Sequence, residues 1–283
     1  MDPHNQLHLW DDRFLYVTPE IHSGLTARST ATLLLSAVGR PFRLEGLDGE
    51  SVRCEAALVA PHVPRRLDVD GGGLLSLNLE PATPAFRQLA PRIGERGIEV
   101  LDPRRFSTLR DLFQPALDGE LNAVQLRHLC TRLVECVTGG PEHVTALDPR
   151  VERVMQALRE NTEPQSLAKL SALACLSPDR LTHLFAQQVG LSIKRYALWG
   201  KVRRSVALIS GAPRLTDVAL NGGFTDAAHM SRTFQSYFGL QPSFVSRQID
   251  VRTNPRKNKR CMESPFDCME RRRIGSRFVA GLN

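Results

Sequence analysis

The apolar residues among the first hundred positions occur in short runs separated by turn residues. Three of these runs lie at 31–35, 56–60 and 74–79, and turn pairs such as Asp48-Gly49 stand between them. In the third run leucine recurs at every second position from Leu75, which predicts a half-buried strand. Short strands at this spacing are typical of a small β-barrel or sandwich.

The spacing of apolar residues changes to three and four after Phe106, and this period predicts helices. The first helix is expected to end at Gly119, and the second to run from Asn122 to Thr138. One stripe of the second helix contains Leu126, Leu129, Leu133 and Val137. Because such a stripe suits packing against a partner, we predict a homodimer formed by residues 1–147. Packing of the stripe against the chain's own strands is the alternative.

The region from Pro149 to about Gln248 has helical spacing throughout. Leu167, Leu170 and Leu173 start another helix, which is followed by Ser177-Pro178, a helix N-cap with proline in the first turn. A long helix is then expected from Ile193 to Ile209.

This helical region contains a repeat. Thr225 matches Ser177 at an offset of 48 residues, and Gly239 matches Gly190 at 49, so the second copy has one extra residue after its turn. Each copy predicts helix, tight turn and helix, which is a helix-turn-helix unit. Cys175 stands where the second copy has Gly223, so we expect the first turn to tolerate a residue other than glycine.

A helix-turn-helix unit places one exposed helix face in the major groove of DNA. Assigning the apolar residues inward leaves two outward sets: Asp179, Arg180, Thr182 and His183 in the first copy, and Ala227, Ala228, Ser231 and Arg232 in the second. Of these, Arg232 can contact guanine through two hydrogen bonds. The candidates for contacts to DNA phosphates are Lys194, Arg195, Lys201, Arg203, Arg204 and His229. Two ordinary helix pairs with solvated outer faces would show the same pattern.

The N-terminal half of the chain has a net negative charge and the C-terminal half has a net positive charge. Residues 1–147 have a net charge of −4, residues 148–250 of +5 and residues 251–283 of +6. This asymmetry indicates that only the second half meets a polyanion. The basic tail from about residue 251 either binds DNA phosphates without sequence preference or is an extension without a function.

The sequence offers little for catalysis. The six cysteines form no Cys-x-x-Cys pair, and the eight histidines form no His-x-His pair. We therefore expect no metal, no cofactor and no catalytic residues. The absence of a secretory signal at the start and of an apolar run of about 20 residues predicts a cytoplasmic protein with free thiols and no membrane partner.

Two motifs carry a family resemblance. The first is Leu-Ser-Pro-Asp-Arg-Leu-Thr-His-Leu-Phe at 176–185, and the second is Gly-Phe-Thr-Asp-Ala-Ala-His-Met-Ser-Arg-Thr-Phe at 223–234, followed by Phe-Gly-Leu-Gln-Pro at 238–242. The stretch from Leu167 to Gln248 resembles the DNA-binding domain of AraC/XylS-type transcriptional regulators. The resemblance implies two helix-turn-helix units joined by the long helix, with both outward sets facing bases. Lys201 stands where the family usually has arginine. Ala227 and Ala228 recognise bases less well than the polar residues often found at these positions, so we expect the second unit to position the protein on DNA more than to select the sequence.

The segment from Ala57 to Leu67 resembles, more weakly, the proline-flanked turn of the cupin-like barrel that forms the sensor in this family. At the mouth of such a barrel, His62, Arg65 and Arg66 are candidates to contact an acidic ligand. Capping of the turn is the alternative role for these three side chains.

Together these observations predict an α+β chain with three parts. Residues 1–147 are expected to form a cupin-like sensor and dimerisation domain, 148–250 a double helix-turn-helix domain, and 251–283 a basic extension. The expected function is sequence-specific regulation of transcription, with activation as the expected direction. The expected partners are double-stranded promoter or operator DNA, a second copy, a small-molecule effector and RNA polymerase. The alternatives are a metal-independent cupin-type enzyme with an accessory helical domain, or a ligand-independent regulator controlled by protein partners.

Overall fold

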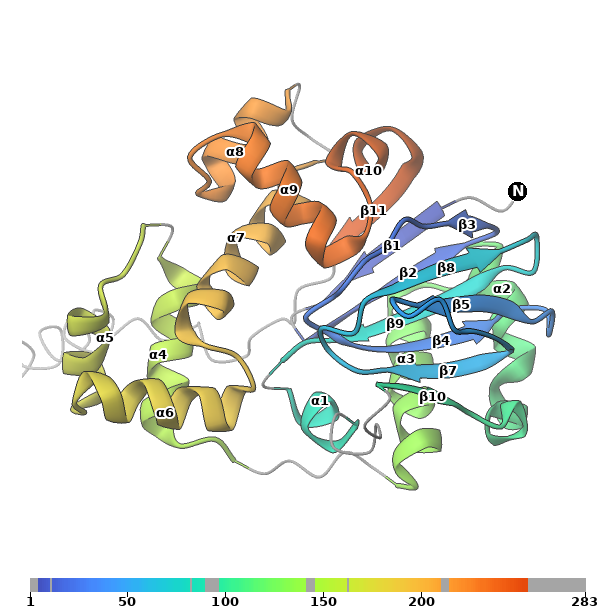
Figure 1. Cartoon of the computed structure of the whole chain (residues 1–283), viewed down its shortest axis with the longest axis horizontal. Coiled ribbons are helices and arrows are strands. Elements are labelled where there is room, and N and C mark those ends of the chain that lie inside the picture. The colour runs from blue at the N-terminus through green and yellow to red at the C-terminus, as the bar shows by residue number, and fades with distance from the viewer. Residues whose placement is uncertain are drawn as a thin grey trace, which may run out of the picture.

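The N-terminal strands form two sheets with an apolar layer between them (Figure 1). The computed structural model describes residues 5–10, 12–81, 83–89, 97–140, 146–161, 163–209 and 214–253. The larger sheet has the order β10-β7-β4-β9-β2-β1-β11, and the smaller has the order β3-β8-β5-β6. Their bounds are β1 Asn5–Leu9, β2 Arg13–Thr18, β3 Ile21–His22, β4 Ala31–Ser36, β5 Phe42–Gly46, β6 Ser51–Cys54, β7 Ala56–Val59, β8 Arg65–Val69, β9 Leu74–Leu79, β10 Ile98–Val100 and β11 Ile249–Thr253.

The three predicted strands correspond to β4, β7 and β9, but the half-buried expectation for β9 is wrong. All six residues of β9 are buried. Leu75, Leu77 and Leu79 face the core beneath the helices, while Leu74 belongs to the layer between the two sheets. Both faces of the sheet are covered. The alternating residues of β9 therefore face two different apolar cores, and neither face of the strand is exposed to solvent.

Helices cover the outer face of the larger sheet. They are α1 Pro84–Leu89, the 3₁₀-helix η2 Pro103–Leu112, α2 Phe113–Leu117 and α3 Ala123–Thr138. Asn122 caps α3 by accepting hydrogen bonds from two backbone N–H groups, and Gly139 ends the helix in the left-handed conformation at φ 79°. The predicted bounds of α3 are therefore confirmed.

The stripe on α3 that suggested a dimer surface is part of the chain's own core. Leu126, Leu129, Leu133 and Val137 are at most 3% exposed and pack in the cluster beneath the larger sheet. These side chains are unavailable to a second copy while α3 stays on its sheet. The alternative explanation, packing against the chain's own strands, is the one that the structure has.

The C-terminal helices form two pairs that flank a long helix. Their bounds are α4 Pro149–Glu160, α5 Leu167–Ala174, α6 Pro178–Val189, α7 Ile193–Ile209, α8 Leu215–Gly222, α9 Ala227–Phe238 and α10 Pro242–Gln248. The long helix has the predicted bounds. In α5, Leu170 is buried, whereas Leu167 and Leu173 are each 42% exposed.

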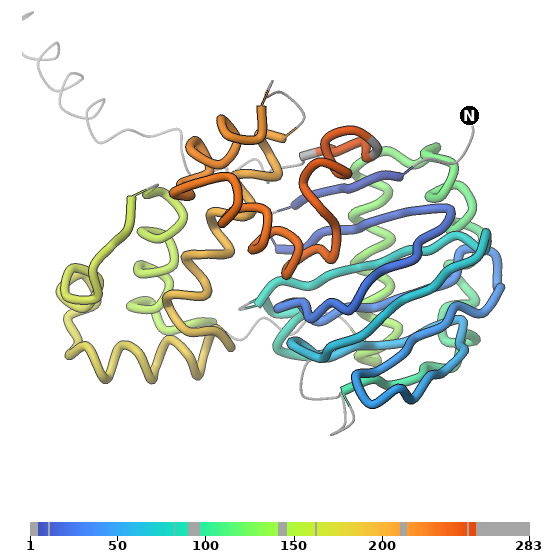
Figure 2. The backbone as a smooth tube through the Cα atoms, turned by 45° about the horizontal axis from the view of Figure 1, so that its top comes forward, coloured from blue at the N-terminus to red at the C-terminus, as the bar shows by residue number. Residues whose placement is uncertain are grey.

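The first helix pair (α5 and α6) and the second helix pair (α8 and α9) belong to different cores. The first packs with α4 and the start of α7 in a separate apolar cluster. The second packs with the later part of α7 and with strand residues of both sheets. Figure 2 shows this arrangement, with the orange helices of the second pair against the blue strands and the yellow first pair farther away. The second pair is thus attached to the N-terminal part.

The turns of the two pairs explain the repeat and its one-residue offset. Cys175 adopts the left-handed conformation at φ 52°, as Gly223 does at φ 88°, which confirms that the first turn accepts a residue other than glycine. The N-cap of α6 is Ser177, but that of α9 is Asp226 and not Thr225. The extra residue of the second copy therefore lies between its turn and its N-cap.

Gly222 allows α8 to approach α7 closely. A Cβ at this position would overlap Ser205 Oγ and lie 3.3 Å from Ser205 Cβ. We expect Gly222→Ala to reduce the free energy of unfolding by about 1–3 kcal/mol through overpacking. Gly200→Ala is the matched control, because a Cβ there meets nothing closer than 3.7 Å, and it should stabilise α7 by roughly 0.5–1 kcal/mol. Denaturant titration of both variants measures the difference, and equal effects would contradict the close-approach argument.

Strand β11 joins the end of the described chain to its beginning. It pairs in parallel with β1, from Asn5 opposite Ile249 to Leu9 opposite Thr253. This strand was not among the predicted elements, and it crosses the expected boundary at residue 250. The remainder of the basic tail, residues 254–283, lies outside the described residues.

Candidate nucleic-acid interface

The outward set of α6 is exposed along the first two turns of the helix. Ser177 accepts a hydrogen bond from the backbone N–H of Arg180, which fixes the start of the helix. Asp179, Arg180 and His183 are solvent-exposed. Thr182 is only half-buried, and its hydroxyl donates to the carbonyl of Pro178 at 2.8 Å. The first pair therefore offers one acidic, one basic and one imidazole side chain on a free face.

The outward set of α9 is narrower. Asp226 accepts from the backbone N–H of His229 at 2.6 Å, and this bond lowers the pKa of the Asp226 carboxyl. Ala228 and Arg232 are exposed, whereas Ala227 and Ser231 are half-buried. Arg232 makes no hydrogen bond or ion pair with any described residue. Its guanidinium is the one strong donor that α9 presents to an outside partner among these four.

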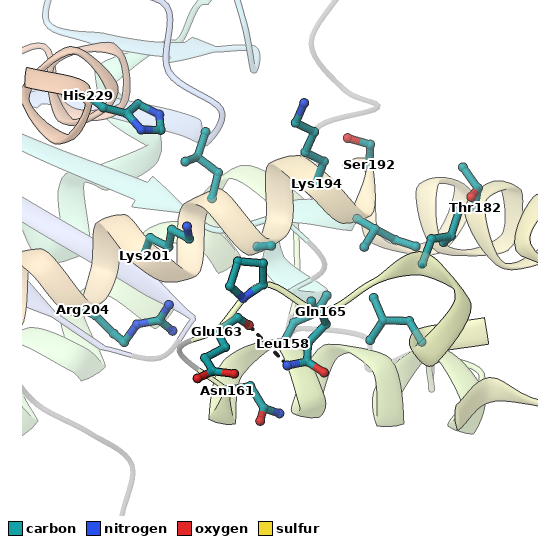
Figure 3. A pocket seen from close by; sticks show the side chains of 16 residues that line it. Leu158, Asn161, Glu163, Gln165, Thr182, Ser192, Lys194, Lys201, Arg204 and His229 are labelled. Atoms are coloured by element: carbon teal, nitrogen blue, oxygen red, sulfur yellow. Dashed lines mark hydrogen bonds between the residues drawn. The ribbon is translucent and has the colours of Figure 1, made fainter. Parts of the chain in front are cut away.

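A groove of about 560 Å³ lies between the two helix pairs, and Figure 3 shows it from close by. Lys194, Lys201 and Arg204 line it from α7, Thr182 from α6 and His229 from α9. Its floor is apolar and includes Leu158, Leu170, Ile193, Ala197 and Leu198. Burial lowers the pKa of Arg204, and its Nε has no partner among the described residues. The structure thus brings four of the six predicted phosphate contacts to the edges of one groove.

Two predicted phosphate contacts point elsewhere. Arg203 donates from Nη1 to Glu80 Oε2 at 3.2 Å and from Nη2 to the carbonyl of Trp10 at 2.6 Å. Arg195 lies 3.5 Å from His62 Nε2, and its carbonyl accepts from the Tyr237 hydroxyl. The prediction for Arg203 is wrong in this conformation, because its guanidinium joins α7 to the N-terminal part and is not free for DNA.

Glu80 and Trp199 form the centre of this junction, and neither was among the predicted site residues. Trp199 Nε1 donates to Glu80 Oε2 at 2.7 Å, while Glu80 Oε1 is buried without a partner among the described residues. Burial raises the pKa of Glu80 to about 7, although Arg203 and the Trp199 N–H act in the opposite direction. An acidic residue directly after an apolar strand is the only sequence signal that Glu80 carries.

The three candidate ligand contacts on the N-terminal part do not come together. Arg65 is buried and donates to the carbonyl of Val63 and to Thr32 Oγ1. Arg66 is exposed, with Nε 3.8 Å from Glu45. His62 adopts φ 63° and faces Arg195, and partial burial together with that arginine lowers its pKa. Neighbours on a strand point to opposite faces, so Arg65 and Arg66 cannot share a ligand inside the sheets.

The structure shows two further features of the described residues. No group of three or more His, Cys, Asp or Glu side chains there is placed to hold a metal ion. None of the helices that it describes has both the length and the apolar character needed to cross a bilayer.

The helical region with its two repeated helix pairs is similar to known DNA-binding proteins. Residues 170–248 match the model of a helix-turn-helix domain. The chain is 31% identical over 140 residues to the arabinose operon regulatory protein of Escherichia coli, which is 48% of this chain and 47% of that protein. It is 32% identical over 106 residues to a XylDLEGF operon transcriptional activator of Pseudomonas putida, covering 36% of this chain and 33% of that protein. The chain thus spans less than half the length of these relatives.

The solved structures extend the likeness to the whole fold. An apo structure of a ToxT variant from Vibrio cholerae superposes with a TM-score of 0.55 over 83% of this chain and 97% of that chain, at 11% identity. A wild-type ToxT structure with a bound unsaturated fatty acid gives 0.52 over 87% and 97%, at 12% identity. At this identity the likeness shows the fold alone. Residues 170–248 thus match a helix-turn-helix domain, and the chain is similar there to AraC/XylS-type transcriptional regulators.

Proposed function

We propose that this protein is a sequence-specific DNA-binding regulator in which α6 and α9 enter successive segments of the major groove. The observation that carries the proposal is the free polar face at the same position of both repeats, with Arg180 and His183 on one and Arg232 on the other. The cations that line the groove between the pairs support it, because phosphates crossing between two major-groove segments need such partners. The double helix-turn-helix arrangement is part of this proposal.

We expect Arg232→Ala to weaken operator binding by roughly ten- to a hundredfold, because a bidentate contact to guanine contributes about 1–3 kcal/mol of discrimination. Lys194→Ala is the matched control: Lys194 is exposed beside the groove. Its loss should weaken specific and scrambled duplexes alike and reduce the salt slope by about one unit. Lys201 is less suitable, since its Nζ lies 5.9 Å above the ring of Phe224.

Titration of both variants on specific and scrambled duplexes at several salt concentrations measures these effects. Arg232 is exposed and unpaired among the described residues, so its replacement should leave the unfolding transition unchanged. Equal losses on both duplexes would reassign Arg232 to phosphate and leave specificity to Arg180, His183 and DNA shape.

The two sheets are proposed to be a cupin-like sensor that acts on DNA binding through the attached second pair. The fatty acid in the ToxT structure supports a small effector as its signal. The named activator among the relatives supports activation as the direction. Contact with RNA polymerase is part of the same proposal. The boundaries 1–147 and 148–250 stay proposals, and so does the homodimer, which requires a surface other than the buried stripe of α3.

A further inference from the structure

Strand β11 is the last strand of the larger sheet and leaves one edge of that sheet open. It lies beside β1 (Figure 1), and no described strand pairs with it on its other side. Asp250, Val251 and Arg252 are only half-buried. In β1, by contrast, the residues from Gln6 to Leu9 are buried. Half of the backbone N–H and C=O groups of an edge strand point away from its sheet, so β11 can pair with one further strand.

The two faces of β11 differ in their chemistry. Ile249 and Val251 pack against the apolar layer between the two sheets. On the other face, Arg252 Nε donates to Asp250 Oδ2 at 2.7 Å. Neighbouring residues of a strand point to opposite faces, so apolar and charged positions alternate along β11. A strand that pairs with this edge must therefore match an apolar face on one side and two opposite charges on the other.

A second copy of β11 meets this requirement. In an antiparallel pair of two β11 strands centred on Val251, the two Val251 residues lie opposite each other on the apolar face. Asp250 of each copy then lies opposite Arg252 of the other copy, because the two residues are equally far from the centre. The pair thus contains two cross-strand contacts between opposite charges, which stabilise a sheet.

The charges also select this register over its neighbours. A centre one residue earlier places Asp250 opposite itself, and a centre one residue later places Arg252 opposite itself. A parallel pair in register places both charges opposite themselves. Like charges directly opposite each other destabilise a sheet. The antiparallel pair centred on Val251 is two-fold symmetric and uses the β11 edge of both copies, so the assembly closes at a dimer.

We propose that β11 is the dimerisation surface of this protein, and that two copies join their larger sheets through antiparallel β11 strands centred on Val251. The inference deepens the homodimer of the proposed function and rests on it. This surface uses none of the stripe on α3, which is buried in the chain's own core. A pairing of five residues is shorter than a standard interface, so we expect a dissociation constant in the micromolar range.

The test measures the association of the full chain by sedimentation at up to about 100 µM, without DNA. The wild type should form dimers. Arg252→Asp places carboxylates opposite each other at both cross-strand contacts, and it should weaken dimerisation at least about tenfold. Arg247→Asp is the matched control, because it makes the same change of charge at an exposed position of α10. It should leave the association unchanged.

The exchange of both charges, Asp250→Arg with Arg252→Asp, restores opposite charges in the same register. It should return the association to within about threefold of the wild type, since the cross-strand contacts are only reversed. Thermal unfolding of dilute protein, at which the wild type is monomeric, checks that each variant is folded.

Hydrogen exchange of the wild type locates the surface without any substitution. The backbone amides of residues 249–253 should exchange more slowly at about 100 µM than at about 1 µM, because pairing protects the outward N–H groups. The amides of β10, at the opposite edge of the same sheet, should exchange at the same rate at both concentrations. Protection of 249–253 that does not depend on concentration would mean that the chain itself covers this edge, which contradicts the proposal.

A wild type that stays monomeric at about 100 µM would overturn the proposal together with the homodimer. A dimer that Arg252→Asp leaves intact, or that the exchange of charges does not restore, would overturn β11 as the surface and leave the homodimer to another one. Titration of the wild type with operator DNA decides DNA binding separately, so the failure of the dimer is distinguishable from the failure of the proposed regulator.

Discussion

Trp199→Ala is expected to lower the free energy of unfolding by about 3–5 kcal/mol, as truncation of a buried aromatic side chain typically does. Trp199 is 3% exposed. Its ring stacks on Tyr237 with centroids 5.0 Å apart, and Phe238 and Phe14 lie at 5.9 and 6.2 Å. The variant removes the side chain that α7 places between α9 and the larger sheet. It also removes the N–H that donates to the buried Glu80.

Denaturant titration followed by circular dichroism measures this loss, and limited proteolysis reports whether the second pair leaves the sheets. Leu198→Ala is the control on the neighbouring position of α7, where the side chain is half-buried beside the groove. Its effect should be clearly smaller. A loss below about 1 kcal/mol for Trp199→Ala, within the range of an ordinary surface substitution, would show that this junction does not hold the second pair in solution.

Glu80 is expected to make the free energy of unfolding depend on pH. Its pKa is raised from the ordinary value of 4.5 to about 7 in the folded chain. A raised pKa means that the folded state binds the proton more tightly than the unfolded state does. The contribution is therefore fully present below pH 4.5 and is lost as the pH rises through 7. Between about pH 5 and pH 8 this amounts to about 2–3 kcal/mol.

Glu80→Gln removes this titration and keeps an acceptor for Trp199. The quantity to measure is the difference in unfolding free energy between wild type and variant at about pH 5 and about pH 8. It should shift in favour of the variant by about 2–3 kcal/mol towards the higher pH. Buried His8, whose pKa is lowered to about 4, titrates in the opposite sense. It is present in both proteins and cancels in the difference. A difference independent of pH would show that the Glu80 carboxyl keeps its ordinary pKa.

The local structure of the C-terminal helices was predictable because their signals are local. The bounds of α7, the N-cap Ser177 and the left-handed Cys175 follow from apolar period, capping preference and repeat alignment within a few residues of each feature. The same signals do not decide which face of α5 is buried. On an eight-residue helix three leucines at three-residue spacing do not show which side faces the core, and Leu170 with Ala174 form that side.

The junction between the two parts was not predictable because its members are far apart in the chain. Arg203 contacts Glu80 and Trp10, and Arg28 contacts Phe238, across more than one hundred residues in each case. An arginine on a basic helix looks the same in the sequence whether it faces DNA phosphates or a buried carboxylate. The stripe on α3 shows the same limit, because an apolar face predicts burial but not the surface that covers it.

The parallel pairing of β11 with β1 has a consequence for how the chain is completed during synthesis. The N-terminal sheet emerges from the ribosome long before residues 249–253, and until then β1 is an open edge with unpaired backbone groups. Open edges recruit other strands, so β1 is an aggregation-prone edge for most of the synthesis. In the completed chain β1 is covered, and the five-residue β11 takes the edge position. A chain that stops before residue 249 would keep that edge, although both of its helix pairs would be intact.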